Sequence, residues 1–295
     1  MASSASTARW NRDRIETGLF GVLRIVVIAG LLLITLFPFY YSVLLSLRPL
    51  DEVLQNPGAL LPGDIDLSSY ASVLSSAAGG GQGFLTFMTN SALVALGTVL
   101  LTLVVALPGA YAVSRLRFFG HRQISVLFLA VYLFPAILLA VPLFVFFTRI
   151  GLRGSLVGLL IVYVSQIVAV SIYMLRNYFD TVPVSLEEAA AIDGCSRLGV
   201  MWRISLPLAK PAIIANALFI FMIAWNEFLF ALLFLVEDRD RWTVSLGISQ
   251  LAGSIEVPDT VLMAGSVIVT LPIIVLFFAS ERLLTEGLTA GAEKG

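Results

Sequence analysis

The chain has 295 residues, of which 59% are hydrophobic and 13% are charged, and its mean hydropathy is +0.97. Soluble domains carry about 25% charged residues, so this composition excludes a protein built around one soluble core and predicts an integral membrane protein. The formal net charge of −1 carries no information about partners, because membrane proteins sort their charges by side of the bilayer, and it does not favour nucleic acid.

The residue types that catalysis needs are scarce. The single cysteine, Cys195, excludes an intrachain disulfide, and with the single histidine, His121, it cannot form a Cys/His zinc cage. Neither lysine, Lys210 or Lys294, is followed by Ser or Thr, so the chain has no phosphate-binding loop of the GxxxxGK(S/T) type. We therefore expect a non-catalytic chain that binds no metal and no cofactor of its own.

Six apolar segments are long enough to cross a hydrocarbon layer of roughly 30 Å at about 1.5 Å per residue. Residues 1–18 form a polar tail before the first of them, and residues 1–14 are expected to be disordered. The first apolar segment, at 19–47, is too long for a signal-peptide core and is expected to remain as a transmembrane helix. The other five lie at residues 87–113, 124–147, 155–175, 212–236 and 261–279. The expected fold is an all-α integral membrane protein with six transmembrane helices.

The arginines and lysines set the orientation. With the N-terminus inside, 13 of the 18 basic residues fall on the cytoplasmic side, as the positive-inside rule requires. Both tails, 1–18 and 282–295, are then cytoplasmic, whereas the loop at 48–86 lies outside. Residues 87–281 form a core of five helices that includes a cytoplasmic loop at 176–211.

The two longer outer loops are rich in acidic residues. The loop at 48–86 is expected to contain a short helix near 67–74 and a flexible glycine run at 79–83. The loop at 237–260 has a central segment that could contact an extracytoplasmic partner through Leu246, Gly247, Ile248, Ser249 and Gln250. Solvated loops without a partner explain the same composition equally well.

Trp225, Asn226 and Glu227 lie together within the fifth apolar segment. A carboxylate at this depth costs roughly 2 to 3 kcal/mol on insertion scales unless it faces protein or water, so Glu227 is expected to point inward. With Asn90, these residues are candidates for a hydrophilic path for a polyhydroxylated solute. A polar clamp between helices is a compatible alternative. No pair of charges within the spans indicates a proton or sodium relay.

The segment 176–211 is a polar island between two long apolar segments. Ser185 and Glu188 have the spacing of a capping box and follow Pro183, which predicts a short helix that begins at Ser185. The helix should end just before Gly194, where a left-handed C-cap would fall.

A second short helix is expected after this glycine. Ser196 can cap its N-terminus, and the helix should run through Ile204 and stop at Pro207. Two short helices that meet at a glycine form a knob suited to a groove in a partner protein, although an ordinary linker between membrane helices is the alternative.

The spacing of Glu188-Ala189-Ala190, Gly194 and Ile204-x-Leu206-Pro207 resembles the signature cytoplasmic loop of ABC importer permeases. The resemblance implies a type I ABC importer permease fold with a cytoplasmic coupling-helix loop. In that family the loop inserts into a cleft of the ATP-hydrolysing subunit. The resemblance assigns this docking role to Glu187, Glu188, Ala189, Ala190, Asp193, Gly194, Ile204, Leu206 and Pro207.

The resemblance covers nearly the whole chain from about residue 19. Asn90-Ser91, the segment 111–117 and Trp225–Phe228 are similar to the carbohydrate-importer branch, and to the permease partner of the maltose importer. So is the ending, which the resemblance expects to insert between ATPase subunits: Gly287, Leu288, Thr289, Ala290 and Gly291. The resemblance also implies that the last outer loop reaches into the binding protein.

The family resemblance implies a multi-pass subunit in a bacterial cell membrane that forms half of the translocation path of an ATP-driven sugar importer. The expected partners are a second, different permease of the same family, two ATPase subunits that bind ATP and Mg, and an extracytoplasmic solute-binding lipoprotein. The expected substrate is a disaccharide such as trehalose or maltose, although the Ser/Arg-rich N-terminus and the glycine run at 79–83 do not map onto the maltose permease.

Three alternatives stand beside this interpretation. An importer of glycerol phosphate or another small solute uses similar permeases, but the sparse positive charge within the spans favours a neutral sugar. A secondary transporter or channel would need no ATPase and would transport by itself in liposomes. A membrane-embedded enzyme would need a metal or nucleophile constellation, which the residue inventory lacks.

Overall fold

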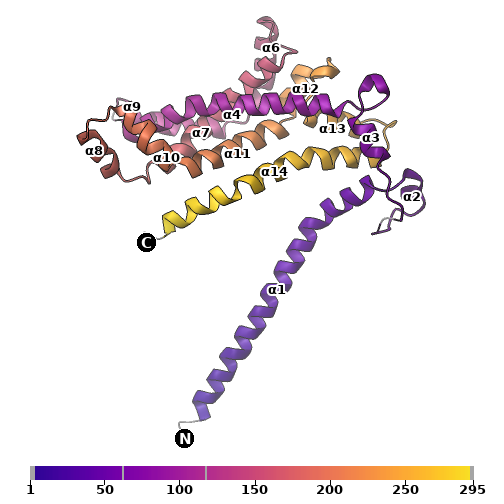
Figure 1. The fold of residues 1–295 in the computed structure, drawn as a ribbon, viewed down its shortest axis with the longest axis horizontal. Coiled ribbons are helices and arrows are strands. Elements are labelled where there is room, and N and C mark those ends of the chain that lie inside the picture. The colour runs from indigo at the N-terminus through magenta and orange to yellow at the C-terminus, as the bar shows by residue number, and fades with distance from the viewer. Residues whose placement is uncertain (1–3, 62, 117, 293–295) are drawn as a thin grey trace. The chain divides into compact units, whose positions relative to one another are not determined.

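The computed structural model describes residues 4–61, 63–116 and 118–292. These residues contain helices and no strand, which confirms the all-α prediction (Figure 1). The chain divides into two compact units, one made of Met1–Tyr70 with Pro258–Val267 and the other of Ala71–Val257 with Ile268–Gly295.

The helices, in chain order, are α1 (Ser4–Ser46), α2 (Leu50–Gln55), α3 (Ser68–Leu74), α4 (Phe84–Arg115), α5 (His121–Leu133), α6 (Ile137–Arg149), α7 (Leu156–Phe179), α8 (Val184–Ile192), α9 (Arg197–Val200), α10 (Leu206–Leu208), α11 (Lys210–Asn226), α12 (Leu229–Leu235), α13 (Val244–Ala252) and α14 (Asp259–Ala292). Between α9 and α10 the chain makes a π-helical turn at Met201–Ser205, and short 3-10 turns lie at Ala77–Gly79 and Arg239–Arg241.

In the first unit, α1 begins at Ser4, inside the segment that was expected to be disordered. Residues 4–17 contain neither proline nor glycine. They therefore extend a helix that the apolar segment behind them nucleates, and adding residues to an existing helix costs little.

The start of the segment that follows α1 is held by a buried arginine. Arg48 is 1% exposed, and its guanidinium donates to a carboxylate oxygen of Glu52 at 2.9 Å and to the carbonyl oxygen of Asn56 at 3.0 Å. A buried guanidinium needs such partners for its donors. The short helix expected near 67–74 is α3.

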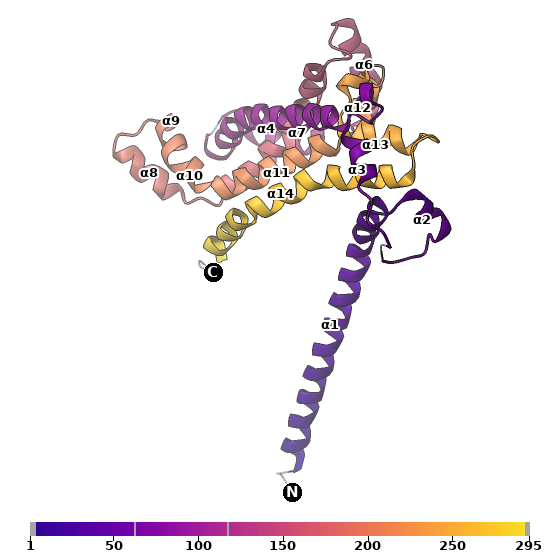
Figure 2. The ribbon, with the colours of Figure 1, turned by 45° about the vertical axis from the view of Figure 1, so that its right-hand side comes forward.

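In the second unit, α4, α7 and α11 run side by side (Figures 1 and 2). The interface between α4 and α7 is built on small residues: Ala106 and Ala110 are fully buried, and a Cβ added at Gly97 would lie 2.5 Å from Cδ1 of Leu160. Small side chains let membrane helices approach closely. Within this unit, α8, α9 and α10 lie at one end of the three helices, and α12 and α13 lie at the other.

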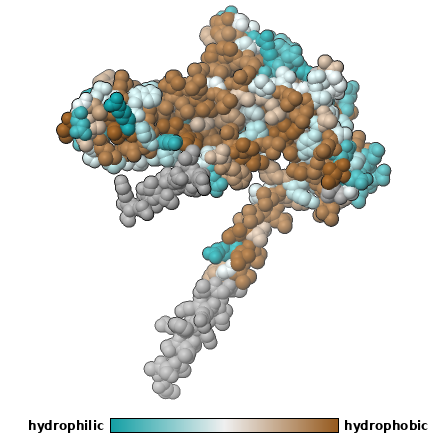
Figure 3. Space-filling model, in the orientation of Figure 1, coloured by the Kyte–Doolittle hydropathy of each residue, from teal (hydrophilic) through white to brown (hydrophobic). Residues whose placement is uncertain are grey.

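The outward side of α4 is strongly apolar. Leu93, Leu96, Leu100 and Val104 are each about 60% exposed and recur at helical spacing. Hydrophobic residues cover much of the face of this unit that Figure 3 shows, and hydrophilic residues gather toward its ends. A continuous apolar surface of this kind suits contact with lipid.

Among the described residues, four helices are long and apolar enough to span a membrane: Phe20–Ser46, Phe84–Arg115, Leu156–Phe179 and Asp259–Glu281. The number rises to six if each of two bent helix pairs is one span, and one of these pairs, Val126–Leu133 with Ile137–Arg149, bends by 90°. The third expected span, 124–147, is therefore not one straight helix. Phe134 precedes Pro135 and is extended, as residues before proline prefer.

The fifth expected span, 212–236, is also interrupted. Helix α11 ends at Asn226, Glu227 has an extended conformation with ψ of 129°, and α12 restarts at Leu229. The interruption coincides with the acidic residue that the sequence places among apolar neighbours.

Candidate functional site

The polar island folds into α8, α9, the π-helical turn and α10, which we call the docking loop. Its first helix starts at Val184, one residue earlier than expected, with Pro183 in the N-cap position. The capping box expected from Ser185 and Glu188 does not form, since α8 has no hydrogen bond from a capping side chain. Pro183, with φ of −60° and ψ of 126°, already sets the chain entering the helix, and Ser185 falls within the first turn.

The end of α8 follows the expectation closely. Gly194 has φ of +85°, and its N–H donates to the carbonyl of Ala191 at 3.1 Å, while the N–H of Cys195 donates to the carbonyl of Ala190 at 3.0 Å. This pair of hydrogen bonds is a Schellman motif, in which a left-handed glycine closes the helix. Ser196 then caps α9, as predicted, by accepting from the N–H of Gly199 at 3.2 Å.

Pro207 does not end the second helix, which corrects the expectation. The helical path continues through Pro207 to Leu208 because the preceding turn, Met201–Ser205, is π-helical. In this wide turn the N–H of Leu206 donates to the carbonyl of Met201, five residues earlier. The wider ladder accommodates a proline, which supplies no N–H and would clash in a regular α-helix.

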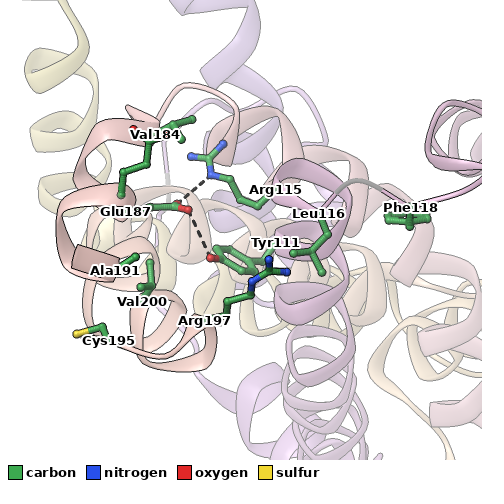
Figure 4. A pocket seen from close by; sticks show the side chains of 11 residues that line it. Tyr111, Arg115, Leu116, Phe118, Val184, Glu187, Ala191, Cys195, Arg197 and Val200 are labelled. Carbon is green, nitrogen blue, oxygen red and sulfur yellow. Dashed lines mark hydrogen bonds and ion pairs between the residues drawn. The ribbon is translucent and has the colours of Figure 1, made fainter. Parts of the chain in front are cut away.

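Glu187 fastens the docking loop to α4. Its Oε1 lies 2.9 Å from Nε of Arg115 and accepts from the hydroxyl of Ser205 at 2.9 Å, while Oε2 lies 3.4 Å from the hydroxyl of Tyr111. Figure 4 shows this carboxylate between Arg115 and Tyr111. The side chains of Glu187 and Arg115 are only 10% and 9% exposed, and Arg115 also donates to the carbonyl of Val182 at 2.8 Å. A charge pair with this burial and this many hydrogen bonds holds one geometry.

Glu188, the next residue along α8, is exposed. Both glutamates line a cavity of about 630 Å³ between the docking loop and the end of α4, together with Tyr111, Cys195 and Arg197 (Figure 4). The resemblance assigned both glutamates to docking. The structure distinguishes them, since the carboxylate of Glu187 is nearly buried and bound within the chain, whereas Glu188 is exposed.

The docking loop also presents apolar side chains to the outside. Ile192 is 87% exposed, and Leu198 and Trp202, four residues apart, are 68% and 64% exposed. Exposed large apolar side chains of this kind are typical of surfaces that contact a protein or a membrane, and the contact of this loop with an ATPase stays a prediction. Of the other residues assigned to docking, Ala189, Asp193, Gly194 and Pro207 are exposed, Ile204 is half-buried, and Ala190 and Leu206 are buried.

Three residues of this site were missed or left without a role by the sequence. Arg115 and Tyr111 belong to a segment marked only by resemblance, and Ser205 was not considered. Arg115 is 72 residues from Glu187 along the chain. The available signal was an arginine at the end of an apolar helix, but no nearby residue indicates its partner.

Glu227 lies at the break between α11 and α12 and acts as the cap of α12. Its carboxylate accepts from the N–H of Phe230 at 2.9 Å, from the N–H of Ala231 at 3.2 Å, and from the hydroxyl of Tyr163 at 2.5 Å. These contacts have the form of the polar clamp that the sequence left open. The role of Glu227 in a substrate path stays a prediction.

The other residues predicted for the path are also held by internal hydrogen bonds. Trp225 is 2% exposed and donates through Nε1 to the carbonyl of Val269 at 3.1 Å. Asn90 is 8% exposed and donates to the carbonyls of Asp240 and Trp242 at 2.8 and 3.0 Å. Asn226 is exposed and donates to the carbonyl of Met222 at 2.8 Å.

The outer segment expected to contact a binding protein forms α13. Leu246 is fully buried, and Gly247 is buried against α4, where an added Cβ would lie 2.6 Å from Cδ2 of Phe87. Ile248, Ser249 and Gln250 are half-buried and form the accessible part of the segment. The backbone of Gly287–Gly291 lies in α14, but the side chains of this ending are outside those that the structure describes.

The comparisons with known proteins agree with one another. Residues 100–289 match the family described as binding-protein-dependent transport system inner membrane component. The chain is 37% identical over 276 residues to a trehalose/maltose transport system permease protein of Thermococcus litoralis, which covers 92% of this chain and 97% of that protein. It is 36% identical over 271 residues to an inner membrane ABC transporter permease protein of Escherichia coli, which covers 91% and 94%.

A solved structure gives the same result. The crystal structure of a bacterial ABC transporter involved in the import of the acidic polysaccharide alginate matches with a TM-score of 0.77 and 27% identity, and the match covers 90% of this chain and 97% of that chain.

Proposed function

Because this chain belongs to the family of binding-protein-dependent transport system inner membrane components, we propose that it forms half of the path by which an ABC importer carries a disaccharide into a bacterial cell. The chain is a non-catalytic transmembrane subunit of an ABC importer. Trehalose and maltose are the first substrates to test, since the relative from Thermococcus litoralis carries both in its name.

One observation carries the proposed coupling mechanism: the docking loop is exposed on one side and fastened on the other. Ile192, Leu198 and Trp202 are available to a partner, whereas Glu187 is tied to Arg115 by a nearly buried ion pair. A displacement of the docking loop by a bound partner would therefore also move α4, because the ion pair joins the two elements. Coupling between two sites requires a rigid connection of this kind.

In the proposed mechanism, ATP closes two partner ATPase subunits, which draw the docking loops of two permeases together. The transmembrane helices then open outward and accept sugar from a solute-binding protein, and ATP hydrolysis resets them. ATP and Mg are bound by the ATPase subunits. The second permease is a different chain of the same family, so that each permease supplies half of the path.

The distribution of basic residues supports the proposed orientation. The docking loop contains Arg197 and Arg203, and the helix end to which it is tied contains Arg115. Positive charge gathers on the cytoplasmic side of bacterial membrane proteins. Both termini and the docking loop are then cytoplasmic, on the side where ATP is available.

Gly194→Val tests the coupling. Valine at φ of +85° is strained, so the turn between α8 and α9 should deform while the transmembrane helices still insert. In proteoliposomes that contain both permeases, the ATPase subunits and the binding protein, we expect the sugar imported per ATP hydrolysed to fall by about tenfold, within the usual range of coupling energies. Glu188→Ala, which removes an exposed carboxylate of the same surface, should also lower this ratio.

Gly151→Val is the matched control. Gly151 also has a positive φ, of 73°, and open space around its Cβ position, but it lies outside the docking loop, after α6. It should leave the ratio of sugar to ATP unchanged. Normal uptake by Gly194→Val would refute the proposed coupling, and ATP-independent transport by this chain alone would show a secondary transporter. Stimulation by glycerol phosphate alone would refute the sugar assignment.

A further inference from the structure

Of the four residues first expected to line the substrate path, only Asn226 is exposed, and its amide donates within the chain to the carbonyl of Met222 at 2.8 Å. The amide of Asn90, the indole N–H of Trp225 and the carboxylate of Glu227 all bind partners within the chain. A substrate would have to displace contacts that join separate segments, since Asn90 binds Asp240, Trp225 binds Val269 and Glu227 also binds Tyr163. A polar group without a partner is a better candidate, because binding would satisfy it.

The described residues place such a group beside a large cavity at the bend between α5 and α6. The cavity has a volume of about 710 Å³, within the range typical of small-molecule sites. Helices α5, α6, α7 and α11 all contribute to its wall, which includes Tyr132, Phe134, Ser165, Gln166 and Ile223. The cavity lies at the 90° bend between Val126–Leu133 and Ile137–Arg149, and Pro135 at the bend is part of its wall.

Gln166 is the unsatisfied group. Its amide nitrogen is enclosed and has no hydrogen-bond partner among the described residues. An unpaired buried donor costs about 1 to 3 kcal/mol, and α7 is a helix long and apolar enough to span the membrane, where lipid offers no acceptor. The torsion that carries the amide is soft, so the amide can turn toward an acceptor inside the cavity that it lines.

The position of Gln166 along α7 agrees with this role. It follows Tyr163 by three residues, and Tyr163 anchors Glu227 at the break of α11. Gln166, in the wall of the cavity, therefore lies within one helical turn of the residue that contacts the break between α11 and α12. Irregular backbone within a membrane is tolerated where it borders protein or a polar space.

The remaining wall groups suit a sugar ring. Tyr132 and Phe134 are 51% and 49% exposed, so each offers part of an aromatic surface to the carbon face of a ring. The hydroxyl of Ser165 donates to the carbonyl of Val162 at 2.7 Å and remains able to accept from a ligand hydroxyl. The wall contains no Asp, Glu, Lys or Arg, whereas a phosphorylated solute calls for a cationic partner.

We propose that this cavity is a binding subsite for a neutral sugar ring, in which the Gln166 amide and the Ser165 hydroxyl bind ligand hydroxyls and Tyr132 and Phe134 contact its apolar face. The proposal rests on the importer function and adds the substrate class, the position of the subsite and the residues that form it. In this proposal the chain contacts the substrate at the bend between α5 and α6 instead of at Trp225–Glu227.

The test is uptake by the complete importer in proteoliposomes, with the neutral sugar that the wild type imports fastest from a panel led by trehalose and maltose. Gln166→Leu keeps the side-chain size and removes both hydrogen-bonding groups. We expect it to lower uptake at subsaturating sugar by about tenfold, the effect of one lost hydrogen bond to the substrate. ATP hydrolysis stimulated by the sugar-loaded binding protein should remain at the wild-type rate.

Gln123→Leu is the matched control, because Gln123 is exposed on α5 and lies outside the wall of this cavity. It should leave uptake unchanged. Wild-type uptake by Gln166→Leu would overturn the subsite while the importer function stands. A wild type that imports only charged solutes would overturn the subsite together with the sugar assignment, and the two failures are thereby distinguished.

A second variant covers the case in which Gln166→Leu does not assemble. Ser165→Cys in a Cys195→Ser background places one thiol in the cavity, and labelling with an uncharged maleimide reports its access to solvent. We expect labelling in the assembled importer and protection by transported sugar. A thiol that is unreactive in the complex would assign the cavity to packing against the second permease and overturn the subsite, as would labelling that sugar does not slow.

Discussion

Two glutamates at opposite ends of the α4–α7–α11 group are held in different ways. Glu187, in the docking loop, lies against a cation, since Nε of Arg115 is 2.9 Å away. Glu227, at the break of α11, is held by neutral donors, the Tyr163 hydroxyl and two N–H groups of α12. The described ion pairs do not include Glu227.

The difference follows from the surroundings of each carboxylate. The docking loop is a polar segment, where a nearly buried ion pair gains a defined geometry at an acceptable desolvation cost. Glu227 lies among apolar residues, and the start of a helix supplies N–H groups and a favourable dipole without a second buried charge. Glu187 therefore joins the docking loop to α4 through an ion pair. Glu227 instead caps α12 and joins it to Tyr163 on α7 through hydrogen bonds.

Arg115→Ala should give the largest effect, because it leaves Glu187 charged and nearly buried without its cation. We expect a loss of about 3 to 5 kcal/mol, typical of removing one partner from a buried pair. Thermal unfolding of the solubilised importer measures it. The control is Arg153→Ala, which removes a pair whose side chains are 31% and 75% exposed and should cost about 1 kcal/mol or less.

The double variant Arg115→Met with Glu187→Met sharpens this prediction. It removes both charges, so it should be more stable than Arg115→Ala. If Arg115→Ala unfolds at the wild-type temperature, the pair does not hold the loop and the contrast with Glu227 disappears.

Glu227→Leu should rank second. The variant loses the cap of α12 and leaves the Tyr163 hydroxyl and two N–H groups without their acceptor, at a cost of about 2 to 3 kcal/mol. Glu227→Gln, which keeps one acceptor oxygen, should cost less in the same unfolding experiment. A glutamine variant as unstable as the leucine variant would show that the charge itself is needed, and the helix-cap interpretation would be wrong.

Tyr163→Phe removes only the hydroxyl that donates to Glu227. A hydrogen bond to a charged group contributes about 1.5 to 3 kcal/mol, and the two N–H donors remain, so we expect the lower end of this range. Tyr178→Phe on the same helix is a control, because its hydroxyl donates to the carbonyl of Leu208 and is exposed. Equal effects of the two substitutions would deny Tyr163 a specific role.

Ser205→Ala should have the smallest effect of the series. Glu187 loses one hydrogen bond but keeps Arg115, so the cost should be about 1 kcal/mol. Unfolding of the same complex measures it. In a background of Arg115→Ala the serine becomes a main remaining partner, and its removal should then cost more; simple additivity would contradict a shared network.

Local features of the docking loop were predictable from the sequence. Gly194 and Ser196 act within five residues along the chain, through a left-handed turn and an N-cap. The predicted capping box of Ser185 and Glu188 does not form because the helix begins one residue earlier, directly after Pro183. The prediction that Pro207 ends the second helix was wrong because the π-helical turn before it changes the backbone hydrogen-bond pattern. No local sequence pattern predicts that turn.

The candidate substrate path was less predictable. The sequence predicted that Glu227 must point toward protein or water, and the structure shows its carboxylate bound by hydrogen bonds within the chain. From the sequence, Gln166 is one of several polar residues in the apolar segments, which more often hold helices together than contact a ligand. The structure places it beside a cavity at the bend between α5 and α6. A position gains this kind of role from residues that are distant along the chain.

Composition and hydrophobic pattern alone determined that this protein is helical and built for a membrane, because apolar segments of spanning length leave few other folds. The spacing of the polar island alone indicated its family. Only the tertiary structure decided which glutamate faces inward, which spans bend and which polar groups lack partners. The physical reason is that each of these depends on a contact such as that of Arg115 with Glu187, whose energy exists only once distant segments have packed.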